Sequence, residues 1–344
     1  MHTVNRPIRT AKELALNIGF RMGYLRFRQL VRRQQALILM FHRFGDEGRG
    51  DPRGLPIRRF EAYMKYLTDR YRVISLGDLI RDLRRGGPAS NTAVVTVDDG
   101  YDDVFSLAVP VMRAYGIPAS IFVVSGFVGG RLWPWTDHFR FVFDRAPRRP
   151  VTFKHRDVTH TIDIRNESEQ RRAEEHWREH AKTLPVAERE DLLGAIAAAY
   201  GIDVPTTAPA EFRSLTWTEL RTLAAQGFDV GAHTRSHPIL SQVGSERLRD
   251  EIHGCKEEIE GSLRHPVPHF AYPNGRREDY TREAVSTVAS AGYGAAVTAV
   301  PGNNTRSTPT LELLRVSAGT DNLARFAQAI SGTTWSASSA SSNG

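Results

Sequence analysis

The sequence predicts an α/β protein built on a parallel β-sheet. Short apolar runs that are typical of buried strands alternate along the chain with segments of helical spacing. Strands and helices in this alternation predict parallel strands joined by crossover helices. The chain has 344 residues, of which 40% are apolar and 25% charged, so it is long enough to bury such a core and has an ordinary soluble composition.

The expected elements follow one another in a regular order. Strands are predicted at residues 36–41, 71–75, 93–97, 119–124, 228–232, 270–272, 294–300 and 313–317. Helices are predicted at 60–69, 76–84, 104–115, 216–227, 245–263, 282–291 and 323–330. The capping box Thr216–Glu219 starts one of these helices, and Gly227 ends it.

Residues 140–210 interrupt this alternation. They are rich in Arg, Glu and His, and helices are predicted near 168–182 and 186–199. We interpret them as a helical insertion, or lid-like excursion, within one domain that spans residues 36–330. The Ser-, Thr-, Gly- and Ala-rich tail 331–344 is expected to be disordered.

The net charge of +7 belongs to the N-terminal segment, residues 1–35. That segment holds eight Lys and Arg residues against Glu13, so the rest of the chain is balanced at 38 to 38 and gives no sign of a nucleic-acid surface. Its apolar residues have helical spacing, so it is expected either to contact an anionic membrane surface peripherally or to pack as a basic helix on protein. Neither a signal peptide nor a transmembrane helix is visible, which favours a location in the cytoplasm or at the inner membrane surface.

The single cysteine, Cys255, restricts the possible metal chemistry. One cysteine excludes an internal disulfide and a multi-cysteine zinc site, so any metal must use His and carboxylate ligands.

Two adjacent carboxylates, Asp98 and Asp99, follow the predicted strand at 93–97 in the stretch TVDDGYDD. Two anions this close need a positive partner to stay ionised together. If Asp99 binds a metal ion, Asp98 points the other way and is free to take a proton from a metal-bound water. Alternatively, both aspartates only cap the following helix and complement its dipole.

Two histidines, His233 and His237, follow the predicted strand at 228–232 in the stretch HTRSHP. On a helical turn, the i,i+4 spacing places both rings on one face, within reach of one metal ion. With one carboxylate they would form a His-His-Asp set with open positions, which suits a catalytic zinc or a similar divalent ion. Histidines in a polar loop are otherwise structural or solvated.

The stretches TVDDGYDD, HTRSHP and FAYPNG, in this order, resemble the motifs of the polysaccharide deacetylase family, the NodB-homology domains or family four carbohydrate esterases. The resemblance covers roughly residues 36–330. The stretches LILMFHRFGD, PASIFVV and RLWPWTD are similar to the branch found in exopolysaccharide and lipopolysaccharide gene clusters. The resemblance to this family implies a distorted (β/α)₇ barrel, similar to a TIM barrel, and metal-dependent removal of N-acetyl groups from a sugar or polysaccharide.

The resemblance also implies roles for single residues. Asp98 is the expected general base, and Asp99, His233 and His237 are the expected ligands of a divalent metal, for which Zn²⁺ is the first choice and cobalt, nickel and manganese remain open. The backbone N–H of Asn274 is expected to help hold the oxyanion.

Further residues are expected to contact an N-acetylated glycan. Tyr272 and Pro273 belong, with Asn274, to the loop that would lie along the substrate. Trp133 and Trp135 are candidates for an aromatic sugar platform, although packing at the barrel rim explains them equally well.

Two features of the family pattern are missing. Ala271 stands where many members have an arginine that orients the base, and Leu313-Leu314-Arg315 stands where many have a Leu-x-His whose histidine protonates the leaving amine. Arginine is a poor general acid but can steady an anion. His42 is a possible substitute acid, or a second-shell histidine.

The chain is expected to be an amide hydrolase acting on carbon–nitrogen bonds other than peptide bonds. Because these two features are missing, two other functions stay open. The alternatives are a carbohydrate-binding pseudoenzyme that keeps the metal, and a hydrolase of a non-sugar amide on the same fold.

Overall fold

The computed structural model describes residues 34–46, 49–51 and 53–331. Seven parallel strands form a closed barrel, with the strand order β1, β13, β12, β11, β10, β7, β6 and back to β1. These strands are β1 (Ala36–Phe41), β6 (Thr92–Val97), β7 (Ala119–Val123), β10 (Asp229–Ala232), β11 (His269–Ala271), β12 (Ala295–Pro301) and β13 (Leu313–Ser317). The predicted distorted (β/α)₇ barrel is confirmed.

The pairing of β1 with β6 closes the barrel. Six residue pairs join these strands in parallel, from Ala36 opposite Thr92 to Phe41 opposite Val97. Every residue of β6 and β7 is buried, as expected for strands covered on both faces. The strand expected at 71–75 is only β5 (Arg72–Val73), which pairs beside the start of β6 and lies outside the closed ring.

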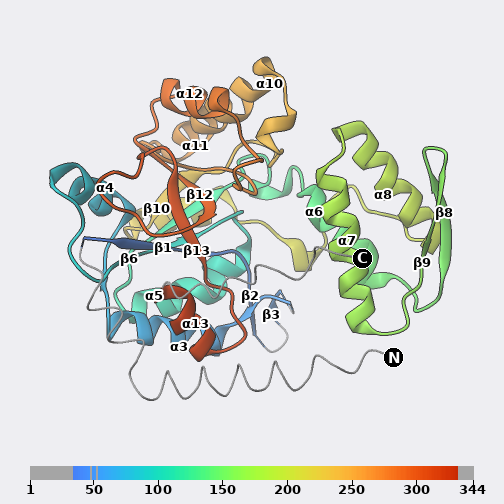
Figure 1. The fold of residues 1–344 in the computed structure, drawn as a ribbon, viewed down its shortest axis with the longest axis horizontal. Coiled ribbons are helices and arrows are strands. Elements are labelled where there is room, and N and C mark those ends of the chain that lie inside the picture. Colours follow the sequence, from blue (N-terminus) through green and yellow to red (C-terminus); the bar gives the residue numbers. More distant parts are fainter. Residues whose placement is uncertain (1–33, 47–48, 52, 332–344) are drawn as a thin grey trace, which may run out of the picture.

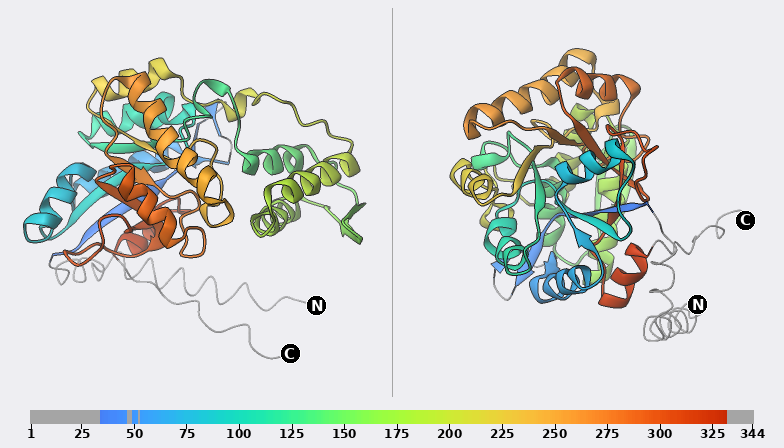
Figure 2. Two further views of the ribbon diagram at one scale, coloured as in Figure 1. Left: turned by 90° about the horizontal axis from the view of Figure 1, so that it is seen from above. Right: turned by 90° about the vertical axis from the view of Figure 1, so that its left-hand side faces the viewer.

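Helices surround the strands, as Figures 1 and 2 show. They are α3 (Ile57–Thr68), α4 (Leu76–Arg85), α5 (Val109–Ala114), α9 (Trp217–Ala225), α10 (Ser245–Arg249), α11 (Cys255–Leu263), α12 (Arg282–Ser290) and α13 (Leu323–Ile330). A small sheet of β2 (Phe44–Asp46), β3 (Arg49–Gly50) and β4 (Leu55–Pro56) follows β1. No described helix has the length and apolarity needed to cross a membrane.

Two predicted helices contain a wider turn than expected. The helix expected at 104–115 begins with a π-helical turn, η1 (Val104–Ala108), and the helix expected at 245–263 has one in its middle, η5 (Asp250–Gly254). Apolar spacing cannot reveal one extra residue per turn, and such turns occur frequently beside functional sites.

The segment at 140–210 lies to one side of the barrel (right in Figure 1). The helix α6 (Trp135–Arg145) leads into it, and it contains the hairpin β8 (Val151–His155) and β9 (Val158–Ile162), α7 (Glu167–Lys182) and α8 (Val186–Tyr200). The helices α7 and α8 lie where they were expected, whereas α6 and the hairpin were missed. The segment packs around a hydrophobic cluster that also includes Tyr101, Val124 and Phe127 from the barrel part of the chain. The predictions for residues 1–35 and 331–344 concern residues that lie almost entirely outside the described part.

Candidate metal centre

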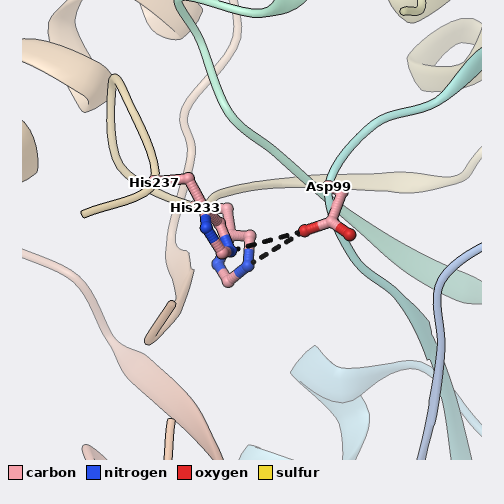
Figure 3. A group of neighbouring side chains, drawn as sticks. All are labelled: Asp99, His233 and His237. Carbon is pink, nitrogen blue, oxygen red and sulfur yellow. Dashed lines mark ion pairs between the residues drawn. The ribbon is translucent and has the colours of Figure 1, made fainter. Parts of the chain in front are cut away.

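Three of the predicted site residues meet at the carboxyl ends of two barrel strands. Asp99 follows β6, and His233 and His237 follow β10. The Nε2 atoms of both histidines lie 3.5 Å from Oδ1 of Asp99, and Figure 3 shows the three side chains pointing toward one another. Among the described residues, these three form the group of His, Cys, Asp or Glu side chains that could hold a metal ion, because one ligand atom of each lies within 4.8 Å of the others.

The two histidines are brought together by a tight turn rather than by the helical turn that was expected. The backbone φ angles of Thr234 and His237 are 67° and 56°, outside the right-handed helical region. The hydroxyl of Thr234 accepts the N–H of His237 at 3.0 Å. The expectation of a helix was wrong, but both rings still face the same point.

The backbone also turns sharply at Asp99, where φ is 74°. Gly100 follows with φ of 86°, and a Cβ there would lie 3.0 Å from a side-chain atom of Val123. The glycine of TVDDGYDD therefore permits the turn that aims Asp99 into the barrel mouth while Asp98 stays in line with the strand.

Both imidazoles can offer Nε2 to a divalent cation, although their pKa values shift in opposite directions. Nδ1 of His233 lies 2.7 Å from the carbonyl oxygen of Ala271 and donates to it, which leaves Nε2 free as a ligand atom. Burial, together with the nearby His233, lowers the pKa of His237 to about 4, so this ring is neutral at neutral pH. Burial alone would lower the pKa of His233, but the adjacent Asp99, together with Asp98, outweighs it and raises this pKa. Two imidazoles and one carboxylate that face one point are a donor set that fits Zn²⁺ or a similar ion.

Arg315, on β13, is the partner of Asp98 that the sequence did not identify. Its guanidinium donates to Oδ1 of Asp98 at 2.7 Å and to Oδ2 at 2.6 Å, and Nε donates to the carbonyl of Thr298 at 2.7 Å. Both partners are buried, with Arg315 only 1% exposed. Burial alone would raise the pKa of Asp98, but Arg315, with His233 nearby, outweighs it and holds the pKa below its usual value.

Ala271 stands where many family members have an arginine, and in this chain the arginine that contacts Asp98 comes from the last strand instead. The sequence did contain a signal, because a charged residue stands inside the apolar strand Leu313–Ser317. A fully buried arginine needs a fixed anionic partner. Only the fold, however, reveals that this partner is 217 residues away.

A cavity of about 170 Å³ joins these groups. Its lining includes the metal candidates, the Asp98–Arg315 pair and several further side chains: Met40, His42, Thr136, Arg178, Tyr272 and Asn274. Thr136 and Arg178 come from α6 and α7, so the insertion contributes to the cavity. Thr136 belongs to the stretch RLWPWTD, whereas no motif in the sequence pointed to Arg178.

The loop after β11 presents Asn274 to this cavity. Asn274 has φ of 56° and Gly275 has φ of 69°, and a Cβ at Gly275 would lie 2.7 Å from the backbone nitrogen of Ala299. The Tyr272 ring stacks on Tyr280, and its hydroxyl donates to the carbonyl of Leu311 at 3.0 Å. Pro273 is buried beside them and does not line the cavity.

The two tryptophans do not line the cavity. Trp133 is 5% exposed and packs against Phe141 and Phe212. The Arg189 guanidinium lies 4.1 Å from the centre of the Trp135 ring. These contacts favour packing over a sugar platform for Trp133.

The chain resembles known proteins over most of this structure. The family model for polysaccharide deacetylases matches residues 85–296. YxkH of Bacillus subtilis (strain 168), a protein provisionally named a polysaccharide deacetylase, is 33% identical over 97 residues, and this match spans only 27% of the chain and 33% of that relative.

Solved structures share the fold at low sequence identity. IcaB from Ammonifex degensii has a TM-score of 0.55 at 18% identity, over 86% of this chain and 98% of that chain. The deacetylase PplD of Streptococcus pyogenes, in complex with acetate, has a TM-score of 0.53 at 17% identity, over 83% and 93%. Because the family model spans more than half of the chain and includes the aspartate pair and both histidines, the chain belongs to the polysaccharide deacetylase family.

Proposed function

We propose that the protein is a metal-dependent hydrolase that removes N-acetyl groups from a sugar or polysaccharide. The observation that carries this proposal is the buried pair of Asp98 and Arg315, which faces the same cavity as Asp99, His233 and His237. A protein that only held a metal would not need a second carboxylate kept ionised in this position.

Asp99, His233 and His237 would hold the divalent ion. When bound, such an ion lowers the pKa of water and polarises the carbonyl of the scissile amide. Asp98 would accept the proton of the attacking water. Arg315 would fix the position of this carboxylate and keep it ionised, the task of the arginine that many family members have where this chain has Ala271.

The developing oxyanion needs a donor on the substrate side of the cavity. Asn274 lines the cavity, on a turn that Gly275 permits, and we assign the donor role to its backbone N–H. The buried Tyr272 and Pro273 hold this loop in place beneath the substrate.

The leaving nitrogen needs a proton, and we assign its supply to His42. His42 follows β1, is exposed, and is the remaining histidine in the lining of the cavity beside the two candidate ligands. Arg315 cannot take this role, because all three of its guanidinium nitrogens already donate to Asp98, Thr96 or Thr298. A histidine at this position also weakens the case for a pseudoenzyme.

The test is acetate release from N-acetylglucosamine oligomers by the Zn²⁺-loaded protein, compared with the Asp98→Asn and His42→Gln variants and with metal content measured for each. We expect both variants to keep the metal and to lose roughly 10²- to 10⁴-fold in kcat, as is typical for removal of a general base or acid. EDTA should abolish activity, and added Zn²⁺ should restore it.

Asp102→Asn is the matched control, because Asp102 belongs to the same motif but pairs with the exposed Arg213. If the wild type binds one metal ion yet releases no acetate from any N-acetylated sugar, the carbohydrate-binding alternative takes precedence. Turnover confined to acetylated non-sugar amides would support the third function. Failure to bind any divalent metal would refute the site itself.

A further inference from the structure

A groove of about 390 Å³ adjoins the metal cavity. Both are lined by Met40 and His42, so the groove continues from the point where the proposed acid stands. On its other sides the groove is lined by Leu55, Arg59 and Thr320. A sugar chain whose acetamido group enters the cavity therefore has room to extend past His42 into this groove.

Most charges in the groove are neutralised by a neighbour. Arg43 donates to Asp103 at 2.8 Å. Arg53 forms ion pairs with Asp144 and with Glu174. Such paired groups present little net charge to a ligand.

Arg59 is different. Asp321, also in the groove, is paired with Arg325 at 2.7 Å. Within the described residues, Arg59 has no carboxylate partner, and its one hydrogen bond goes to the carbonyl of Thr320 at a long 3.4 Å. This half-buried guanidinium thus faces the groove with most of its donors unused.

The position of Arg59 is also unfavourable for a cation. It lies in the first turn of α3, and this turn contains no acidic residue. The dipole of a helix disfavours positive charge there. A larger hollow of about 630 Å³, lined by other residues, offers a contrast, because its arginines are paired: Arg131 with Glu258, Arg235 with Asp250 and Arg247 with Glu251.

We propose that this groove binds an anionic substituent of the glycan, a carboxylate or a phosphate, and that Arg59 is the residue that recognises it. This inference rests on the proposed deacetylation, since it names the class of sugar that the same site accepts. Guanidinium groups match the geometry of both anions and hold them with charge-assisted hydrogen bonds.

The test compares three acetylated substrates: neutral chitotetraose, a hyaluronan tetrasaccharide that carries uronic carboxylates, and chitotetraose bearing a terminal phosphate. We expect the wild type to prefer one or both acidic substrates in kcat/KM at low salt. Arg59→Gln should reduce that preference roughly ten-fold, mainly through KM, the effect of one charge-assisted hydrogen bond. Added salt should weaken the preference in the wild type more than in the variant.

Arg58→Gln is the matched control, because Arg58 is the neighbouring residue on α3, is exposed and does not line the groove. It should leave the preference unchanged. The two acidic substrates distinguish a carboxylate from a phosphate as the recognised group. Equal kcat/KM for neutral and acidic substrates, or equal losses in the two arginine variants, would reject the subsite.

Binding measurements separate this inference from the proposed function. Calorimetric titration of the three oligosaccharides into wild type and Arg59→Gln needs no turnover. If no acetate is released but the acidic sugar binds about ten-fold more weakly to Arg59→Gln, deacetylation fails and the subsite stands. If acetate is released and Arg59→Gln binds the acidic sugars as tightly as the wild type does, only the subsite fails.

Discussion

Arg315 shows how much a single side chain contributes to this site. It lies inside the barrel, where it satisfies both carboxylate oxygens of Asp98 and the carbonyl of Thr298. Taking two charges out of water is costly, and a buried pair offsets that cost only when its hydrogen bonds are complete. Here every guanidinium nitrogen donates and both carboxylate oxygens accept, so the pair holds a carboxylate ionised at a buried position beside the candidate metal ligands.

The first prediction concerns the stability of this pair. Arg315→Met leaves Asp98 buried without a partner and should reduce the free energy of unfolding by about 3–5 kcal/mol. The double variant Asp98→Asn/Arg315→Met removes both charges and should recover more than half of that loss. Urea unfolding, with m-values compared between the variants, measures both effects.

An exposed ion pair provides the control for this experiment. Arg171→Met breaks the surface pair with Glu167 and should cost no more than about 0.5 kcal/mol. A double variant that is as unstable as Arg315→Met would contradict our account, because the loss would then come from the missing arginine stem rather than from the unpaired charge.

At the scale of elements, the π-helix η5 stabilises the loop between the two candidate ligands, His233 and His237. Glu251, in η5, is 3% exposed, and its Oε2 accepts the backbone N–H groups of Arg235 and Ser236 at 2.9 Å each. The Ser236 hydroxyl donates to Oε1. One carboxylate thus replaces the hydrogen bonds that a helix would have supplied between His233 and His237.

The second prediction follows from these contacts. Glu251→Ala should weaken Zn²⁺ binding about 10- to 100-fold, the range typical of residues that orient metal ligands. Glu251→Gln keeps one acceptor oxygen and should give a smaller loss. Competition with a chromogenic chelator measures the affinity, and circular dichroism checks that each variant is folded.

Glu257→Ala is the matched control for Glu251, since Glu257 is exposed on the next helix, α11. It should bind Zn²⁺ as the wild type does. Unchanged affinity in a folded Glu251→Ala protein would show that the turn holds its shape without this carboxylate.

The elements also show what a sequence can and cannot predict. Apolar runs followed by polar residues located the strand ends at Asp98 and His233, because a buried strand requires continuous apolar residues. The turn at His233–His237 was mistaken for a helix, since i,i+4 spacing does not specify the backbone between the two rings. The contact of Arg315 with Asp98 depends on barrel closure, and no local pattern contains that information.

At the scale of the whole molecule, polar contacts join the insertion to the barrel. Arg53 pairs with Asp144 and Glu174, and Arg140 pairs with Asp51. These contacts hold α6 and α7 against the barrel, where Arg178 reaches the metal cavity. Composition suggested an insertion or lid-like excursion at 140–210. The contacts instead favour a fixed wall of the site over a mobile lid, because a lid would have to break several ion pairs to open.

The third prediction uses a buried contact between these two parts. The hydroxyl of Tyr101, in the barrel, donates to Oδ2 of Asp137, in α6, at 2.6 Å. The pKa of Asp137 is raised to about 7, mainly by burial and also by the charge of Asp99. Arg43, the Tyr101 hydrogen bond and Arg140 lower this pKa but do not offset the effect of burial. The folded protein therefore keeps this proton at a pH at which the unfolded chain has lost it.

The sign of the pH dependence follows from linkage. Below the ordinary Asp pKa of about 3.9, both states are protonated and Asp137 has no effect. Between about pH 4 and pH 7 only the folded state holds the proton, so ionisation of the unfolded chain lowers the free energy of unfolding as pH rises. Above about pH 7 both states are ionised, and the contribution becomes constant.

Asp137→Asn removes this titration but keeps an oxygen that accepts the Tyr101 hydroxyl. Relative to the wild type, the variant should gain on the order of 2 kcal/mol between pH 5 and pH 7.5, measured by urea unfolding across that range. Asp157→Asn, exposed between β8 and β9, should run parallel to the wild type. Parallel profiles for Asp137→Asn and wild type would mean that Asp137 is already ionised in the folded protein, held by Arg43 and Arg140, and that barrel and insertion meet through charge rather than through a shared proton.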